Sequence, residues 1–212
     1  YPRNLKLELP STHTWQGWDE LNLNTQFTYN QLLGSVFYRA AGLPVYGSKA
    51  VQVRLNSLNH AAPENARLAH PFEHHFGMYV HNQPINGDYA REHYPSDPGG
   101  NLYRMTGAGS SWDYFPDSAD PGRDYRSAGW DKENNKAAND WSDLQRFIQV
   151  MSTSSGRLPQ VESVMDLDSW LRNLAVGTIL TNAENSIFTG RDDDYALYCG
   201  SDGRFQLIPH DL

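Results

Sequence analysis

The stretch from Met165 to Leu212, MDLDSWLRNLAVGTILTNAENSIFTGRDDDYALYCGSDGRFQLIPHDL, contains the pattern that decides the fold. Its first part predicts a helix, because Asp166 or Asp168 can cap a helical start and apolar residues then recur at i, i+3 and i+4. The expected buried stripe consists of Leu167, Trp170, Leu171, Leu174, Ala175, Thr178 and Ile179. The helix should end near Asn182, which tolerates the left-handed conformation, so that a short polar loop carries Glu184 beyond it.

The second part of the same stretch predicts a β-hairpin. Residues 195–199 and 204–208 are short alternating runs on either side of 200–203, whose sequence Gly-Ser-Asp-Gly is typical of a turn. Pro209 should end the second strand, because proline cannot donate to a sheet ladder, and it delivers Asp211 just past the strand end. The stretch therefore carries one carboxylate in the loop after the helix and another after the hairpin.

Helix, acidic loop, hairpin and aspartate is the order in which protein kinases present their catalytic loop and their metal-binding aspartate. Phosphoryl transfer needs two such acids, one to orient the attacking hydroxyl and one to hold Mg²⁺ on the nucleotide phosphates. Many α+β proteins contain a helix followed by a hairpin, so the order of elements alone leaves a purely structural alternative open.

The residues themselves resemble a family, the CotH (spore coat protein H) kinase-like proteins, which occur in large secreted bacterial proteins. The similar segments are collinear and span nearly the whole chain: Leu21–Asn24, Phe37–Pro44, Phe76–Val80, Gly99–Arg104, Trp141–Leu144, Thr181–Glu184, Asp193–Tyr198 and Phe205–Leu212. The resemblance implies an α+β, atypical protein-kinase-like fold, truncated in this chain, with mixed or antiparallel sheets and packed helices. It also implies ATP and Mg²⁺ as cofactors.

The resemblance assigns roles to the polar residues of the last stretch. Glu184 takes the catalytic-acid position, where the family has aspartate, and Asn182 completes that site. Asp211 takes the metal position, and Asp194 is a secondary metal ligand, with a solvated turn as the alternative for Asp194. Glutamate is one methylene longer than aspartate, which can move a proton acceptor by about 1 Å and lower the rate by roughly 10²-fold.

Two residues nearer the N-terminus are candidates for cofactor binding. Leu5, Leu7 and Leu9 alternate with polar residues in a predicted strand, and Lys6 is the lysine that this strand could offer to the nucleotide phosphates. A solvent-facing Lys6 is the alternative. Gln83 stands where related proteins tend to carry a glutamate that orients the lysine, so the amide keeps the shape of that group and loses its charge.

The rest of the chain predicts further elements. A helix should start at Asn30 with a buried apolar stripe and end before Gly42 and Pro44. The stripe consists of Leu32, Leu33, Val36, Phe37, Ala40 and Ala41. Alternation predicts strands over 51–55 and 76–80, which we expect to pair. Asp140 should cap a helix that has Trp141, Leu144, Ile148 and Met151 on one side.

Composition limits the classes of protein. With 212 residues and 39% hydrophobic content the chain can form its own core, so residues 1–212 are expected to form one domain, incomplete at both ends. The net charge of −8 disfavours nucleic-acid binding and attraction to an anionic membrane. No apolar run approaches about 18 residues, so no membrane insertion is expected.

Residues 57–75 and 105–139 are polar enough to predict insertion loops. The first holds His60, His70, His74 and His75, for which solvated side chains are favoured over a zinc site because the ligand spacing is wrong. Exposed Trp112, Trp130 and Trp141 would permit carbohydrate binding, a possibility that only composition supports.

The sequence is therefore interpreted as an ATP- and Mg-dependent atypical kinase domain that transfers phosphate to hydroxyls of protein substrates. The resemblance implies an extracellular, cell-surface or periplasmic location within a longer multidomain chain. The alternative is a non-catalytic pseudokinase or surface-interaction module in a larger secreted protein, because Gln83 and Glu184 both depart from the family pattern.

Overall fold

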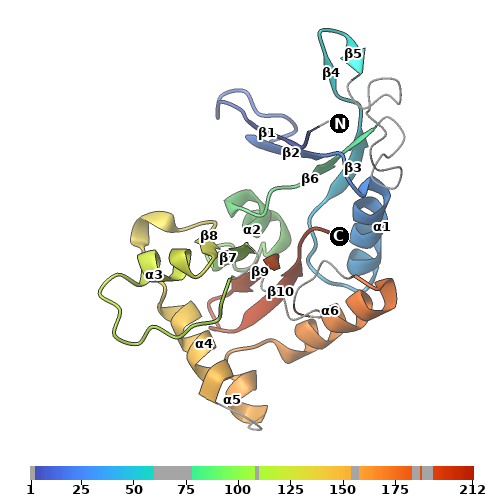
Figure 1. Cartoon of the computed structure of the whole chain (residues 1–212). Helices are drawn as coiled ribbons and strands as arrows, with labels where there is room; N and C mark the ends of the chain where they lie inside the picture. Colours follow the sequence, from blue (N-terminus) through green and yellow to red (C-terminus); the bar gives the residue numbers. More distant parts are fainter. Residues whose placement is uncertain (1–2, 60–77, 108–109, 154–157, 183–186, 188–192) are drawn as a thin grey trace. The chain divides into compact units, whose positions relative to one another are not determined.

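The structure is a computed structural model and describes residues 3–59, 78–107, 110–153, 158–182, 187 and 193–212 (Figure 1). Its helices and strands confirm the α+β class. The chain divides into two compact units, the first made of Tyr1–Ala40, Tyr46–Pro84 and Leu212, and the second of Ala41–Val45 and Ile85–Asp211. One domain over 1–212 stays a prediction, since two compact units can belong to one domain. None of the helices in the described ranges is long and apolar enough to cross a membrane.

The first unit contains a four-stranded antiparallel sheet, ordered β1 (Leu5–Glu8), β2 (Glu20–Asn24), β6 (Tyr79–Asn82) and β3 (Ser48–Val51). The β3–β6 pair confirms the expected pairing only at Val51, which pairs with Tyr79. The predicted strand over 51–55 is otherwise wrong, because β3 covers Ser48–Val51 and Arg54–Leu55 belong to β4. A small hairpin of β4 (Arg54–Leu55) and β5 (Leu58–Asn59) turns at Asn56 and Ser57, whose φ angles are 51° and 68°. Of the expected loop over 57–75, residues 60–75 and their histidines lie outside the described residues.

Helix α1 (Thr28–Ala40) confirms the predicted helix but buries the opposite face. Leu33, Val36 and Phe37, expected in the buried stripe, are 58%, 56% and 51% exposed. The buried residues are Thr28, Gln31, Gly34, Ser35 and Tyr38. The prediction of an apolar buried face is therefore wrong.

Polar side chains on the sheet explain which face α1 buries. The Asn82 amide on β6 donates to Oε1 of Gln31, and the Asn24 amide on β2 donates to the same oxygen at 3.3 Å. Ser48 Oγ on β3 donates to Asn82 Oδ1 at 2.7 Å. Because buried amides need hydrogen-bond partners, the sheet selects the face of the helix that carries Gln31.

The connection between β1 and β2 brings two tryptophans onto a buried histidine. The Trp18 ring stacks on His81 with centroids 4.9 Å apart, and Trp15 meets the same imidazole edge-on at 5.3 Å. His81 is buried, and neither of its ring nitrogens has a hydrogen-bond partner among the described residues. This burial, with a smaller contribution from Lys49, lowers the pKa of His81 to about 4.

The second unit contains another four-stranded antiparallel sheet, ordered β10 (Phe205–Pro209), β9 (Asp193–Cys199), β7 (Asn101–Thr106) and β8 (Trp130–Lys132). Its helices are α2 (Gly87–His93), α3 (Pro121–Ser127), the 3₁₀ helix η2 (Lys136–Ala138), α4 (Ser142–Thr153), α5 (Leu158–Glu162) and α6 (Leu167–Leu180). The predicted hairpin is confirmed, with Tyr195 paired to Pro209 and Cys199 to Phe205.

The range 105–139, expected to be an insertion loop, is part of this unit's framework. It supplies α3 and β8, and Tyr125 and Trp130 are fully buried in the core against which the sheet packs. Trp141 is also buried there, and Trp112 packs against the same core. These tryptophans are not an exposed carbohydrate-binding surface, so that expectation is wrong.

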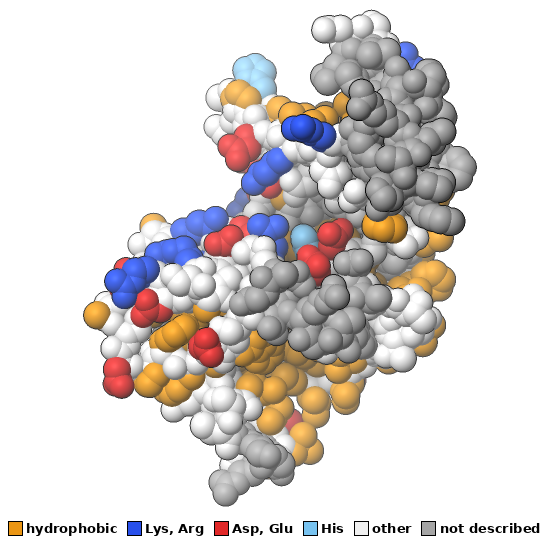
Figure 2. Space-filling view, viewed as in Figure 1, with side chains coloured by type: hydrophobic (Ala, Val, Ile, Leu, Met, Phe, Trp, Pro, Cys, Tyr) orange, Lys and Arg blue, Asp and Glu red, His pale blue; other side chains and the backbone are white. Residues whose placement is uncertain are grey.

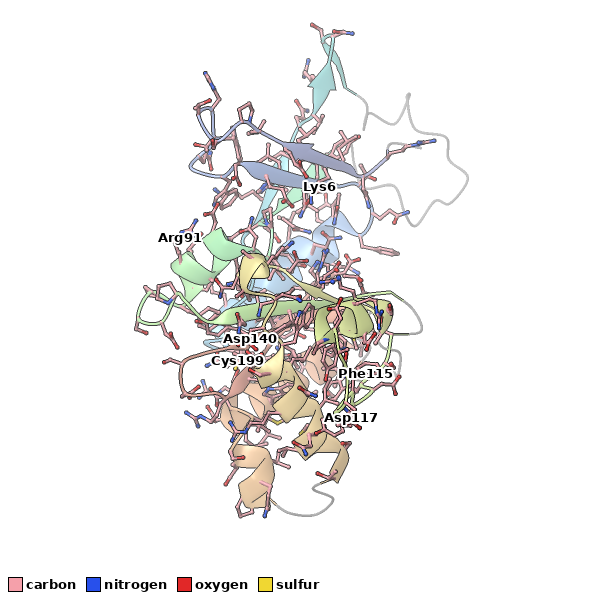
Figure 3. All side chains as sticks on the ribbon, turned by 90° about the vertical axis from the view of Figure 1, so that its left-hand side faces the viewer. Lys6, Arg91, Phe115, Asp117, Asp140 and Cys199 are labelled. Atoms are coloured by element: carbon pink, nitrogen blue, oxygen red, sulfur yellow. The ribbon has the colours of Figure 1, made fainter. Side chains whose placement is uncertain are left out.

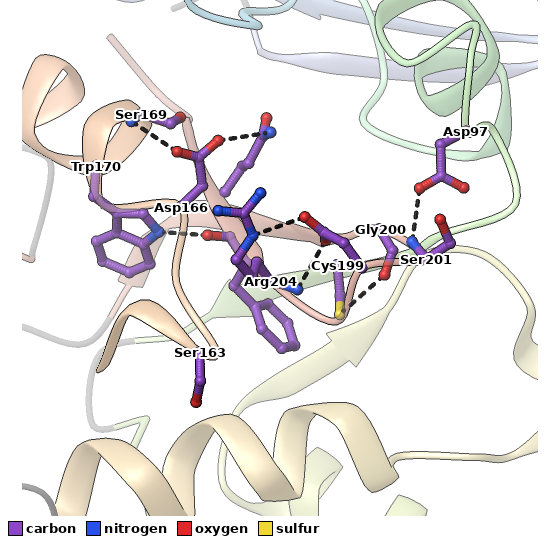
Figure 4. Close-up of polar contacts among 12 residues, drawn as sticks. Asp97, Ser163, Asp166, Ser169, Trp170, Cys199, Gly200, Ser201 and Arg204 are labelled. Atoms are coloured by element: carbon purple, nitrogen blue, oxygen red, sulfur yellow. Dashed lines mark hydrogen bonds and ion pairs between the residues drawn. The ribbon is translucent and has the colours of Figure 1, made fainter. Parts of the chain in front are cut away.

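Helix α6 is capped as predicted by Asp166, whose carboxylate accepts a hydrogen bond from Ser169 N at 3.3 Å (Figure 4). Trp170 Nε1 donates to the Phe205 carbonyl at 2.8 Å, which attaches the helix to β10. The predicted stripe is only partly right, because Trp170 is buried while Leu171 and Ile179 are 56% and 79% exposed. The buried face is instead completed by Ser169, Asn173 and Gly177.

A buried lysine joins α4 to the sheet of the second unit. Lys132 on β8 donates to the Asp140 carbonyl and, at 3.2 Å, to the Tyr103 hydroxyl on β7. Tyr103 Oη donates to Asp143 Oδ1 on α4 at 2.6 Å, and Asn101 Nδ2 donates to Asp143 Oδ2 at 2.8 Å. Figure 3 labels Asp140 just before α4. These residues form what we call the lysine network, which satisfies a buried ammonium and a buried phenol at once.

We predict that Asp143→Asn lowers the free energy of unfolding by about 1–3 kcal/mol, because one carboxylate oxygen that accepts a hydrogen bond becomes an amide nitrogen and leaves a partner unsatisfied. Urea unfolding followed by circular dichroism measures this. Asp168→Asn, at an exposed position on α6 paired with Arg172, is the control and should have little effect. Equal effects of the two substitutions would contradict the role given to Asp143.

We predict that His81→Phe removes part of the acid sensitivity of the first unit. A pKa lowered from 6.5 to about 4 means that the folded state favours neutral His81. The contribution of His81 to the free energy of unfolding is therefore full above pH 6.5 and is lost as the pH falls toward 4. Phenylalanine keeps the stacking and does not titrate. Melting temperatures between pH 4 and 7 should fall less steeply in His81→Phe than in the unsubstituted protein, whereas His13→Gln, at an exposed site, should change nothing. Parallel curves for His81→Phe would exclude this contribution.

Candidate functional site

The two aspartates expected to bind metal lie at the same end of the β9–β10 hairpin. The last paired residues there are Tyr195 and Pro209, and the turn between the strands is at the opposite end. Asp194 directly precedes Tyr195, and Asp211 follows Pro209 by two residues. Antiparallel pairing therefore brings both aspartates to what we call the open end of the hairpin.

A β-bulge sets the position of Asp194. The register between β7 and β9 pairs Arg104 with Ala196 and then Thr106 with Asp193, so β9 contains one more residue than β7 over this interval. Asp194 lies within the extra length and has a φ of 61°. Bulges of this kind redirect a side chain and disrupt the ladder, and they are frequent beside active sites.

Asp211 also has a left-handed backbone, with a φ of 49°. A residue other than glycine in this conformation costs on the order of 1 kcal/mol, and such positions persist where the surrounding structure holds them. Because both aspartates at the open end share this feature, the structure fixes two carboxylate-bearing residues in conformations that the backbone alone disfavours. Asp194 and Asp211 are two of nine residues other than glycine that have a positive φ in the described part of the chain, so the prediction for these two rests on their shared place at the open end of the hairpin.

Two basic residues that the sequence analysis did not single out belong to the same sheet or directly follow it: Arg104 lies on β7, and His210 follows β10. Burial, with a smaller contribution from the Arg104 guanidinium, lowers the pKa of His210 to about 4. Arg104 forms an ion pair with Glu133, Nε to Oε1 at 2.8 Å, and Lys136 approaches the other oxygen of Glu133 at 3.6 Å. Arg104 ends the segment Gly99–Arg104 that resembles the family, which was the sequence signal available for it.

Asn182, expected to complete the catalytic site, follows the end of α6. The helix ends at Thr181, whose φ of 50° makes it the left-handed cap one residue earlier than predicted. The Asn182 backbone N–H donates to the Gly177 carbonyl at 2.9 Å. Glu184, the predicted catalytic acid, lies outside the described residues, so its position relative to Asp211 stays a prediction.

Lys6 is held by acids of its own sheet. Its Nζ lies 3.2 Å from Glu20 and 3.9 Å from Glu8, and the lysine side chain is 58% exposed (Figure 3). This matches the solvent-facing alternative. Two further lysines that the sequence analysis did not consider lie in strands, Lys49 in β3 and Lys132 in β8. Lys49 was missed because β3 starts before the predicted strand, and its Nζ donates to Gln16 Oε1 at 2.9 Å.

Gln83 serves a backbone connection in the first unit. Its side-chain Oε1 accepts a hydrogen bond from Gly47 N at 3.2 Å, and its own N–H donates to the Gly47 carbonyl at 2.8 Å. Gln83 is 3% exposed. An amide in place of glutamate therefore suits a buried position with a backbone partner, which is a structural reason for the departure from the family pattern.

The fold is α+β, and two acidic residues lie at the open end of the β9–β10 hairpin. A comparison with protein families gives the class of the protein. The family described as CotH kinase protein matches residues 3–212. The chain belongs to this family over essentially its whole length. No curated protein matches the chain.

We predict that Gln83→Glu lowers the free energy of unfolding by about 1–3 kcal/mol at pH 7, because it places a charge at a buried site that serves a neutral hydrogen bond. Burial raises the pKa of such a carboxyl, so the loss should shrink as acidification protonates it. Gln16→Glu, an exposed substitution of the same kind beside Lys49, is the control. Thermal unfolding at pH 7 and pH 4 tests this, and a Gln83→Glu protein as stable as the control at pH 7 would contradict it.

Proposed function

We propose that this member of the CotH kinase family binds ATP with Mg²⁺ and transfers the terminal phosphate to a hydroxyl group of a protein. The observation that carries the proposal is the pair Asp194 and Asp211, both with left-handed backbones at the open end of one hairpin. Carboxylate oxygens are the ligands that Mg²⁺ prefers, and few protein ligands are needed because the phosphates supply others. The donor set therefore fits the ion.

The roles of the chain's own residues follow from this chemistry. Asp211 and Asp194 would hold the ion, which, when bound, neutralises charge on the phosphates. The acceptor oxygen attacks the terminal phosphorus, the bond to the bridging oxygen breaks, and ADP leaves. Glu184 would orient the hydroxyl and take its proton, and Asn182 would support that loop. The atypical kinase-like fold and an extracellular, cell-surface or periplasmic location within a longer chain belong to the same proposal.

A non-catalytic module of the same family is the second candidate. The backbone contacts of Gln83 favour it, because this residue has a structural use that needs no lysine or nucleotide. Glutamate at 184 in place of aspartate favours it as well. In this case the protein would interact with its partners through the fold without transferring phosphate.

We predict that Asp211→Asn weakens MgATP binding at least tenfold, because the ion loses an ionised oxygen ligand. Isothermal titration calorimetry of MgATP into the two proteins measures the effect. Asp202→Asn, in the turn at the opposite end of the hairpin where Asp202 pairs with Arg204, is the matched control and should keep the affinity of the unsubstituted protein. Unchanged affinity in Asp211→Asn would remove this residue from the proposed site.

Transfer of labelled phosphate to protein acceptors separates the two candidate functions. Binding with transfer supports the kinase, and binding without transfer to any acceptor in a broad protein panel supports the non-catalytic module. An unsubstituted protein that does not bind MgATP would overturn the proposed use of ATP.

A further inference from the structure

We propose that Arg104, and not Lys6, is the cation that contacts the terminal phosphate of the nucleotide. The inference rests on the proposed function and names the residue that binds the terminal phosphate in it. Phosphoryl transfer requires a positive group on the transferred phosphate, because negative charge is concentrated there. Lys6 on β1 and Arg104 on β7 are the two strand residues compared as partners for an anion at the open end of the hairpin.

Lys6 is poorly suited to this task. Two carboxylates, Glu20 at 3.2 Å and Glu8 at 3.9 Å, already surround its ammonium group. Both acids belong to β1 and β2, the strands that form the hairpin on which Lys6 lies. An ammonium that is paired with two acids attracts phosphate weakly, since the local charge is already balanced or negative.

Arg104 belongs to the sheet that carries the candidate metal ligands. The register pairs Arg104 with Ala196 and Ala196 with Ile208, so these three residues form a row across β7, β9 and β10. His210 lies two residues beyond Ile208, which places it on the same face of the sheet while the strand stays extended. The register therefore places Arg104 and His210 on one face of the sheet, next to the open end of the hairpin. Asp211 is the next residue.

The local charges leave Arg104 able to bind an anion. Glu133 is its ion-pair partner, and Glu133 is shared with Lys136, so two cations use one carboxylate. Asp131 is the cross-strand neighbour of Arg104 and forms no ion pair with it within the described residues. A guanidinium has five N–H donors, more than one carboxylate can accept, and the Arg104 side chain is 35% exposed.

Arg104 has an acid, Glu133, beside it, unlike a cation on a uniformly basic surface. Figure 2 shows Lys and Arg side chains interspersed with Asp and Glu side chains on the face in view. Arg104 Nε lies 2.8 Å from Glu133 Oε1 in an ion pair, but this nitrogen has no hydrogen-bond partner among the described residues, so the guanidinium keeps its donors for the planar arrangement that suits phosphate oxygens. The ligand is thus a terminal phosphate held next to Mg²⁺.

The experiment compares MgATP and MgADP binding by calorimetry in the unsubstituted protein, Arg104→Met and Lys6→Met. Arg104→Met should weaken MgATP binding at least tenfold and change MgADP binding less than threefold, because the missing contact is to the terminal phosphate. Lys6→Met is the matched control and should change both affinities less than twofold. Circular dichroism of each variant checks folding.

Arg104→Lys provides the second variant, which keeps the charge and the partner Glu133 but loses the planar fork. It should weaken MgATP binding by an intermediate factor while MgADP binding is retained. Equal MgATP affinity in Arg104→Met and the unsubstituted protein, an equal loss for MgATP and MgADP, or a loss confined to Lys6→Met would each overturn the assignment. Absence of MgATP binding by the unsubstituted protein would instead overturn the proposed function, and the assignment with it.

Discussion

The burial of the Lys132 ammonium is the constraint on which the second unit depends. A buried cation must be hydrogen-bonded, and Lys132 obtains its partners from Tyr103 and the Asp140 carbonyl, on segments that come together only in the folded unit. Asp143 completes the network from α4. The lysine network therefore fixes the edge of the sheet and the start of α4 together, and it joins the segments Gly99–Arg104 and Trp141–Leu144 through hydrogen bonds of Asn101 and Tyr103 to Asp143.

The two units use the same principle with different chemistry. In the first unit buried neutral amides are centred on Gln31, and in the second unit the lysine network contains charged groups. Helices α1 and α6 both bury polar residues, and each has a glycine on its buried face. A Cβ added at Gly34 in α1 would lie 3.0 Å from the Leu212 side chain, and Gly177 is buried in α6. Apolar side chains such as Leu33 are consequently left on the outside.

The sequence predicted those structural features that depend on residues close to one another along the chain. The β9–β10 hairpin, the Asp166 cap and the pairing of β3 with β6 follow from turn chemistry, capping and alternation. The buried faces of α1 and α6 could not be predicted from apolar periodicity, because hydrogen bonds to distant strands decide them. The same reason applies to the candidate site: Asp194 and Asp211 could be proposed from their positions in the sequence, whereas the backbone contacts of Gln83 and the ion pair of Arg104 depend on partners far away in the sequence.

The left-handed backbone at Asp194 and Asp211 bears on the order in which the hairpin forms and opens. A hairpin closes first at its turn, here 200–203, and pairs outward from it, so the residues beyond Tyr195 and Pro209 reach their native angles last. The conformational cost at these two positions and the interrupted ladder at the bulge both lower the free energy needed to open this end of the hairpin. A cation bound by both carboxylates only in the paired hairpin would raise that free energy by mass action.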